Sequence, residues 1–290
     1  MRELLVIADK RSNTHTGFVH ALEIAQNTGA KIEFVGFVYA AGVDGSEVLT
    51  HQEKRKVRDT YVDKKKQKIK CFLASLDLKG VVVDIDVVWE KSLESWVVQR
   101  CEQKSFDLVF KTGNRTEAFL YTPSDWQLMR NCPDPVMIIG EKPWRKGGKV
   151  LAALDLGAQT ENSWQLNKNI VNLSVAIAYA TNSEIHACYS VTRAGVLGAR
   201  NLETDDYFKK ILKSIDPIIR NLLKSKGMTK DRLHIVSGNP VNELCRTISA
   251  IDADLVVVGK RTRASLRGLL LGATSENVLH VANADVLVTS

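Results

Sequence analysis

The feature that most constrains this chain of 290 residues is an internal repeat. An apolar run that ends in an aspartate occurs twice, at 4–9 (LLVIAD) and at 150–155 (VLAALD). Three further pairs of segments match in the same order, namely 24–35 with 177–188, 106–110 with 253–257, and 135–139 with 285–289. Blocks that recur in one order at a spacing of about 150 residues indicate a duplicated domain.

A cluster of proline, glycine and charged residues at 141–148 (EKPWRKGG) separates the two copies. We therefore expect two domains, residues 1–145 and 146–290. Because the connection is short, we expect the two domains to pair within the chain. A homodimer of the chain is left open.

Within each copy, short apolar strands alternate with longer helical patterns, which is typical of consecutive βαβ units. We expect an α/β chain of two tandem Rossmann-like domains, each a five-stranded parallel sheet with helices on both faces. In the second copy the expected strands are 149–154, 185–190, 233–236, 254–259 and 285–289. The expected helices are 163–181, 205–226, 240–250 and 274–281. Such a sheet binds ligands at the carboxyl ends of its strands, where the strand order reverses.

The segment that follows the fourth strand of the second copy, residues 259–278, has the features of a phosphate site. Gly259 ends the strand, a basic loop follows, and Gly272 opens a helix with Thr274 and Ser275 in its first turn. Free backbone N–H groups and the positive end of a helix attract an anion, and small residues let it approach closely. An ordinary strand-to-helix connection with a hydroxyl cap is the alternative interpretation.

These residues resemble the universal stress protein family. The family's nucleotide motif is G-x-x-G, nine residues, then G-S or G-T, and this chain has Gly259-x-x-Thr262, nine residues, then Gly272-Ala273. The resemblance runs over essentially the whole chain and is closest to the tandem E type in four stretches, 106–109, 122–126, 132–136 and 142–149. It implies a regulatory protein of the stress response that binds an adenine nucleotide, ATP, in its second domain.

The resemblance also implies roles for nine positions. Asp155 would contact the adenine, and the backbone near Ser190 would border the base. Val258 and Gly259 would flank the ribose. The phosphates would be lined by Thr262, Gly272, Ala273, Thr274 and Ser275. Two of these depart from the motif, since Thr262 replaces its second glycine and Ala273 replaces its serine or threonine.

The first copy departs further from the motif. Its corresponding loop reads KTGNRT at 111–116, and the position of Gly272 falls on Tyr121 or Thr122, with Pro123 next. Proline has no N–H to offer a phosphate. We therefore expect a degenerate first domain without a nucleotide of its own, although Asp9 persists after its first strand.

The charge pattern argues for a small anionic ligand as partner. The chain has 40 basic and 33 acidic residues, a net charge of +7, which is too small to indicate nucleic acid. The basic stretch 54–68 is interleaved with acidic and apolar residues at helical spacing, which is typical of the solvated face of a long helix. Contact with nucleic acid or a membrane surface is the alternative for that stretch. We expect no nucleic-acid partner and no membrane insertion.

The sequence lacks the common motifs of disulfide frameworks, metal sites and catalytic sites. Five scattered cysteines without a C-x-x-C pair favour buried thiols in a cytoplasmic protein, and the cysteines and histidines lack metal-ligand spacing. We predict no metal. No G-x-x-x-x-G-K-[ST] or G-x-S-x-G motif is present, and a slow ATPase would lack an identifiable general base. Two other hypotheses are a non-catalytic scaffold with both sites degenerate, and a carrier of an apolar or acyl ligand in the pocket vacated in the first copy.

Overall fold

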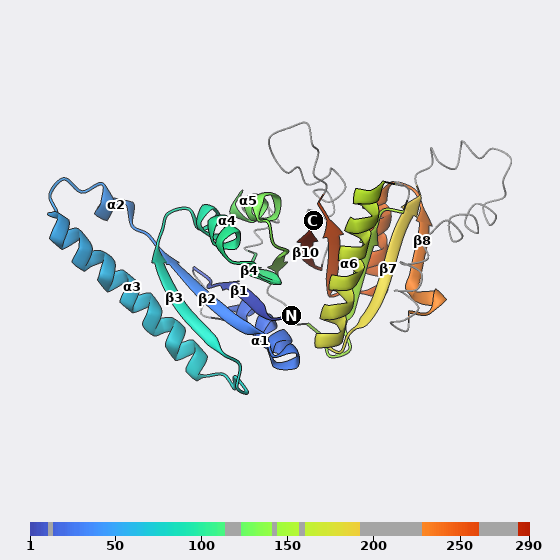
Figure 1. Ribbon diagram of the computed structural model, residues 1–290, viewed down its shortest axis with the longest axis horizontal. Coiled ribbons are helices and arrows are strands. Elements are labelled where there is room, and N and C mark those ends of the chain that lie inside the picture. Colours follow the sequence, from blue (N-terminus) through green and yellow to red (C-terminus); the bar gives the residue numbers. More distant parts are fainter. Residues whose placement is uncertain (11–13, 114–122, 141–143, 157–159, 192–227, 261–283) are drawn as a thin grey trace. The chain divides into compact units, whose positions relative to one another are not determined.

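The computed structural model describes residues 1–10, 14–113, 123–140, 144–156, 160–191, 228–260 and 284–290. The described chain divides into two compact units, the first ending at residue 140 and the second starting at Trp144. Both units are drawn in Figure 1, and each is described here by itself.

The first unit is a five-stranded parallel sheet in the order β3-β2-β1-β4-β5. Its strands are β1 (Glu3–Ile7), β2 (Lys31–Val38), β3 (Val83–Trp89), β4 (Leu108–Thr112) and β5 (Val136–Ile139). Its helices are α1 (Thr16–Thr28), α2 (Ala41–Asp44), α3 (His51–Ala74), α4 (Leu93–Gln103) and α5 (Pro123–Asn131).

The second unit repeats this order as β8-β7-β6-β9-β10, again with parallel pairs. Its strands are β6 (Lys149–Leu154), β7 (Glu184–Val191), β8 (Leu233–Ser237), β9 (Leu255–Gly259) and β10 (Asp285–Thr289). Between them lie α6 (Glu161–Ala180), the short η1 (Lys230–Arg232) and α10 (Pro240–Ile251). The duplication and the two five-stranded parallel sheets predicted from the sequence are confirmed. The helices predicted at 205–226 and 274–281 lie outside the described residues.

Both faces of each sheet are covered, as the continuous apolar strands predict. In the first unit Phe34 of β2 meets Phe18 of α1 and Phe72 of α3, with ring centroids 4.5 and 6.4 Å away. On the opposite face Phe37 meets Trp96 of α4 at 5.4 Å. Helices α1 and α3 therefore share one face. This arrangement follows from right-handed crossovers, which change face when the direction of strand addition reverses.

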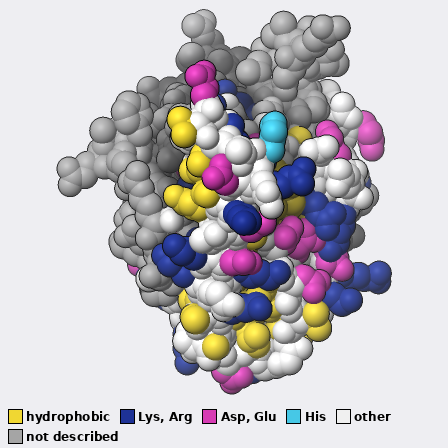
Figure 2. Space-filling model, turned by 90° about the vertical axis from the view of Figure 1, so that its left-hand side faces the viewer, with side chains coloured by type: hydrophobic (Ala, Val, Ile, Leu, Met, Phe, Trp, Pro, Cys, Tyr) yellow, Lys and Arg dark blue, Asp and Glu magenta, His cyan; other side chains and the backbone are white. Residues whose placement is uncertain are grey.

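The long helix α3 carries the basic stretch found in the sequence. A capping box starts it, with Thr50 Oγ1 accepting from the Glu53 N–H at 3.3 Å and Glu53 Oε2 accepting from the Thr50 N–H at 2.9 Å. Of its 24 residues only Ile69 and Leu73 are buried. Figure 2 looks at the molecule from the side where α3 lies, and basic and acidic side chains are interspersed there. This mixture fits the solvated helix face that the spacing predicts.

The cysteines correct one expectation. All five are free, but only Cys101, Cys132 and Cys188 are buried, whereas Cys245 is half-buried and Cys71 is exposed. Cys71 lies on the outward side of α3, where most side chains are in contact with water, so its helical position and not its residue type decides its exposure.

Among the described residues, no helix is long and apolar enough to cross a membrane. No group of three or more potential metal ligands was found in the same ranges.

Candidate functional site

The carboxyl ends of β6, β7 and β9 lie next to one another at one edge of the second sheet. The strand order reverses between β6 and β9. Asp155 follows β6, Ser190 lies near the end of β7, and Val258 and Gly259 end β9. The structure thus brings four of the nine predicted site residues to the edge where open α/β sheets bind ligands. The other five, Thr262, Gly272, Ala273, Thr274 and Ser275, lie outside the described residues.

Asp155 is held by its backbone, which leaves its side chain exposed. Its N–H donates to Asn167 Oδ1 at 3.0 Å, and Asn167 Nδ2 donates to the Asp155 carbonyl at 2.8 Å. Asn167 is only 1% exposed, so both bonds are made in the interior. The amide of Asn167 therefore extends the hydrogen bonding of β6 by one residue and fixes the backbone of Asp155.

Sequence reasoning missed Asn167, although a signal exists. The buried face of α6 also carries Ile170, Val171 and Ser174, and Asn167 occupies the same face three residues earlier. An amide on an apolar helical face near the end of a strand needs hydrogen-bond partners there. The backbone of the strand-ending aspartate supplies them.

Gly259 is required by packing. A Cβ atom built at this position would lie 2.7 Å from Leu166 Cδ2 and within 2.9 Å of two further Leu166 atoms. Leu166, which lies against Gly259 of β9, directly precedes Asn167, which bonds to Asp155 after β6. The strand-ending glycine thus lets α6 approach the site closely enough for Asn167 to reach Asp155.

Ser190 makes one side-chain hydrogen bond to a neighbouring loop, and Val258 is buried. The Ser190 hydroxyl donates to the Gly238 carbonyl at 3.3 Å, which ties β7 to the loop before α10. Asn239 caps that helix by accepting from the N–H groups of Val241 and Asn242 at 3.0 and 3.3 Å. Val258 is 3% exposed, so its contribution to the site edge is through its backbone.

The matching edge of the first unit is filled by the chain's own side chains. The Asp9 N–H donates to His15 Nδ1 at 3.0 Å, and Lys65 Nζ of α3 donates to the Asp9 carbonyl at 2.6 Å. The Asp9 side chain is 9% exposed, in contrast with the exposed Asp155. Burial raises the pKa of Asp9, and a hydrogen bond from Thr112 and the charges of Lys65 and Lys111 oppose the rise.

The end of β4 also carries side chains of the chain itself, whereas β9 ends in a glycine. Thr112 pairs with Ile139 as Gly259 pairs with Thr289, so the two positions match, and Thr112 Oγ1 accepts from the Gly17 N–H at 3.0 Å. Lys111 forms an ion pair with Asp125 of α5, and the two residues are 6% and 0% exposed. A lysine and a carboxylate of the chain thus form a buried ion pair at the strand end that matches Val258 and Gly259.

His15 makes the stability of the first unit depend on pH. Burial and the nearby charge of Lys65 lower its pKa to about 4 from the ordinary value of 6.5. Between these pH values the unfolded chain binds a proton at His15 that the folded chain does not, so stability falls as the pH is lowered. The raised pKa of Asp9 acts in the opposite direction at the acid end.

We therefore expect His15→Asn to flatten the pH dependence. Asparagine tolerates the left-handed backbone of residue 15 (φ 44°) and offers an oxygen to the Asp9 N–H, but it does not titrate. The difference in unfolding free energy between the two proteins should change by at most about 1.4 kcal/mol per pH unit between pH 6.5 and 4. Urea unfolding at several pH values measures it, and parallel curves would show that His15 titrates normally.

Comparisons with known proteins show which proteins this chain is similar to. A model of the universal stress protein family matches residues 149–290. Over 99% of the chain, the sequence is 25% identical to universal stress protein E of Escherichia coli K12 and 23% identical to a universal stress protein E homolog of Haemophilus influenzae, covering 93% and 96% of those proteins.

Solved structures show the same fold. A functionally unknown protein from Pseudomonas aeruginosa PAO1 superposes with a TM-score of 0.73 at 22% identity, covering 100% of this chain and 92% of that one. A universal stress protein from Archaeoglobus fulgidus gives a TM-score of 0.66 at 15% identity, with 99% and 98% covered.

Residues 149–290 form a domain of the universal stress protein family. The relatives that the chain matches over nearly its whole length are of the E type, which confirms the resemblance found in the sequence.

Proposed function

We propose that the second unit, residues 146–290, binds an adenine nucleotide, ATP, and that the first unit, residues 1–145, binds none. The observation that carries the proposal is the contrast between the two strand-ending aspartates. Asp155 is exposed and held in place through its backbone, whereas Asp9 is covered by Lys65 and His15.

The chemistry of the second edge suits a nucleotide. An exposed carboxylate accepts hydrogen bonds from an exocyclic amine of a base. Gly259 lets α6 pack closely against the end of β9, next to the strand end where the resemblance places the sugar. In the motif resemblance, the loop that follows brings Gly272, Thr274 and Ser275 for the phosphates, with Lys260 and Arg261 as nearby cations. The protein acts in this proposal as a nucleotide-responsive regulator and not as a fast catalyst.

We further propose that the protein works in the cytoplasm. Its five cysteines are all free thiols in the structure, and a reducing compartment keeps thiols in that state. Fractionation of cells that express the protein with a small C-terminal tag tests this location.

Titration calorimetry with ATP tests the nucleotide proposal. We expect one site per chain, and we expect Asp155→Ala to weaken binding by about tenfold, or about 1.4 kcal/mol, because one base contact is lost. Asp9→Ala is the matched control in the first unit and should leave the affinity unchanged. Two equivalent sites, or a loss of binding with Asp9→Ala, would contradict the assignment of the site to the second unit.

Absence of ATP binding by the folded protein would favour a scaffold without nucleotide, or a carrier of an apolar ligand. The first unit offers one observation against the carrier. The space beside Asp9 is occupied by an aromatic cluster in which His15 lies 4.7 Å from Phe72 and 5.4 Å from Phe34. Mass spectrometry of the denatured protein, as purified, would detect such a ligand.

A further inference from the structure

Two cysteines of the first unit are in contact although they are 31 residues apart in the sequence. Cys101 lies in the last turn of α4, and Cys132 follows α5 directly. The Cys132 thiol donates to Cys101 Sγ over 3.5 Å, and the two residues are 0% and 5% exposed. A disulfide has an S–S length of about 2.05 Å, so these are two reduced thiols in van der Waals contact.

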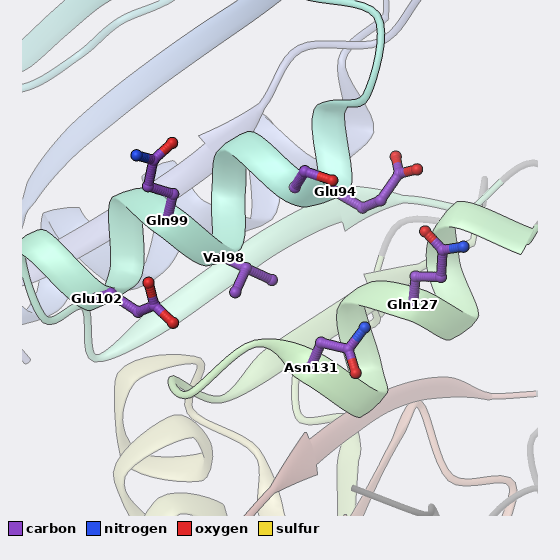
Figure 3. Close-up of a pocket in the computed structure, with 7 residues that line it drawn as sticks. Glu94, Val98, Gln99, Glu102, Gln127 and Asn131 are labelled. Atoms are coloured by element: carbon purple, nitrogen blue, oxygen red, sulfur yellow. The ribbon is translucent and has the colours of Figure 1, made fainter. Parts of the chain in front are cut away.

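A groove lies between α4 and α5, the helices that carry or precede the two cysteines. It has a volume of about 380 Å³ and is lined by Glu94, Ser95, Val98, Gln99 and Glu102 of α4 and by Gln127 and Asn131 of α5. Figure 3 shows the two helices side by side, with Glu102 and Asn131 toward their carboxyl ends. Each of these residues is the sequence neighbour of one of the two cysteines. The groove is thus next to the two cysteines in the sequence, although neither cysteine lines it.

We propose that Cys101 and Cys132 are an oxidisable dithiol, which hydrogen peroxide converts to an intramolecular disulfide. One thiol, after losing its proton, attacks the O–O bond of the peroxide, which gives a sulfenic acid and releases water. The sulfur of the second thiol then attacks the sulfenic sulfur, the S–O bond breaks and a second water leaves. The two sulfurs lose two electrons, and the two peroxide oxygens gain them.

Contact between the two sulfurs favours a disulfide once either thiol has been oxidised. The hydrogen bond from Cys132 and burial raise the pKa of Cys101, which slows its reaction with peroxide. The thiols already touch, and closure needs a shift of about 1.5 Å between the sulfurs. Cys188, in the second unit, contacts the Thr247 hydroxyl at 3.6 Å instead. The disulfide would join α4 to α5 covalently on one face of the first sheet.

Peptide mapping of the full chain tests the proposal without any variant. The protein is reduced, treated with hydrogen peroxide, alkylated after denaturation and cut with trypsin. We expect a linked pair of peptides, 101–104 and 131–145, whose mass is lower than the sum of the two reduced peptides by two hydrogens. Dithiothreitol should separate them again. Alkylation of both cysteines after peroxide, oxidation to sulfinic acid without a link, or a link to Cys71 would each overturn the proposal.

Variants provide matched controls. Cys101→Ala should remove the linked pair and leave Cys132 open to alkylation. Cys71→Ser, which changes the exposed cysteine, should leave the linked pair unchanged. Circular dichroism confirms that each variant is folded before oxidation. If Cys101→Ala does not fold, the mapping of the wild-type protein and of Cys71→Ser still decides the outcome.

Discussion

Asp125→Ala should lower the unfolding free energy of the first unit by about 3–5 kcal/mol, because it leaves the ammonium of Lys111 buried without its partner. Lys111 is 6% exposed and Asp125 is fully buried, so water cannot replace the lost carboxylate without local opening. For a domain of this size the melting temperature should fall by roughly 10 °C. Differential scanning calorimetry of the full chain measures the shift.

Two further variants separate burial from charge. The double variant Lys111→Met with Asp125→Leu should restore most of the stability, because a buried ion pair can be replaced by apolar side chains at little cost. Arg246→Ala removes an exposed ion pair with Glu243, in which the arginine is 75% exposed, and should change stability by less than about 1 kcal/mol. A loss below about 1 kcal/mol in Asp125→Ala would mean that water reaches Lys111.

This ion pair is a physical difference between the two copies of the fold. At the matching strand ends the second unit has Val258 and Gly259, whereas the first has Lys111 and Thr112. The first unit thus carries a buried cation and anion of its own at the strand end that matches Val258 and Gly259.

Most of the fold could be predicted from the sequence. The repeat of apolar strands fixes the number of domains, and the strands expected at 149–154 and 285–289 agree with β6 and β10. Helix α6 begins at Glu161, two residues before the expected 163, because Thr160 caps it by accepting from the Ser163 N–H at 3.3 Å. Apolar periodicity does not report such a polar first turn, since its residues face water.

The side chains that pack at the strand ends of the two units could not be predicted from the apolar pattern. Lys65 reaches Asp9 from 56 residues along the chain, and it lies in a stretch whose other lysines are mostly exposed. Periodicity shows which helix face is buried, but not which strand end that face meets. The roles of Lys65 and of Leu166 appear only once the register of helix and sheet is known.

Gly259→Thr should weaken ATP binding by about a hundredfold, or about 2.7 kcal/mol. Its new Cβ would lie 2.7 Å from Leu166 and would push on α6. Asn167 follows Leu166, so the same displacement loosens both hydrogen bonds that hold Asp155. Overpacking should also cost about 1–3 kcal/mol of stability, so binding is measured by calorimetry at a temperature where circular dichroism shows the variant to be folded.

A compensating pair of substitutions distinguishes this steric mechanism from a direct effect on the ligand. Gly259→Ala alone should weaken binding, and Gly259→Ala with Leu166→Ala should recover most of the affinity, because the smaller side chain on α6 makes room for the Cβ. Thr112→Gly, the matched change in the first unit, should not alter ATP binding. If the double variant binds as weakly as Gly259→Ala, the Cβ blocks the nucleotide itself, and the contact between α6 and β9 does not control the site.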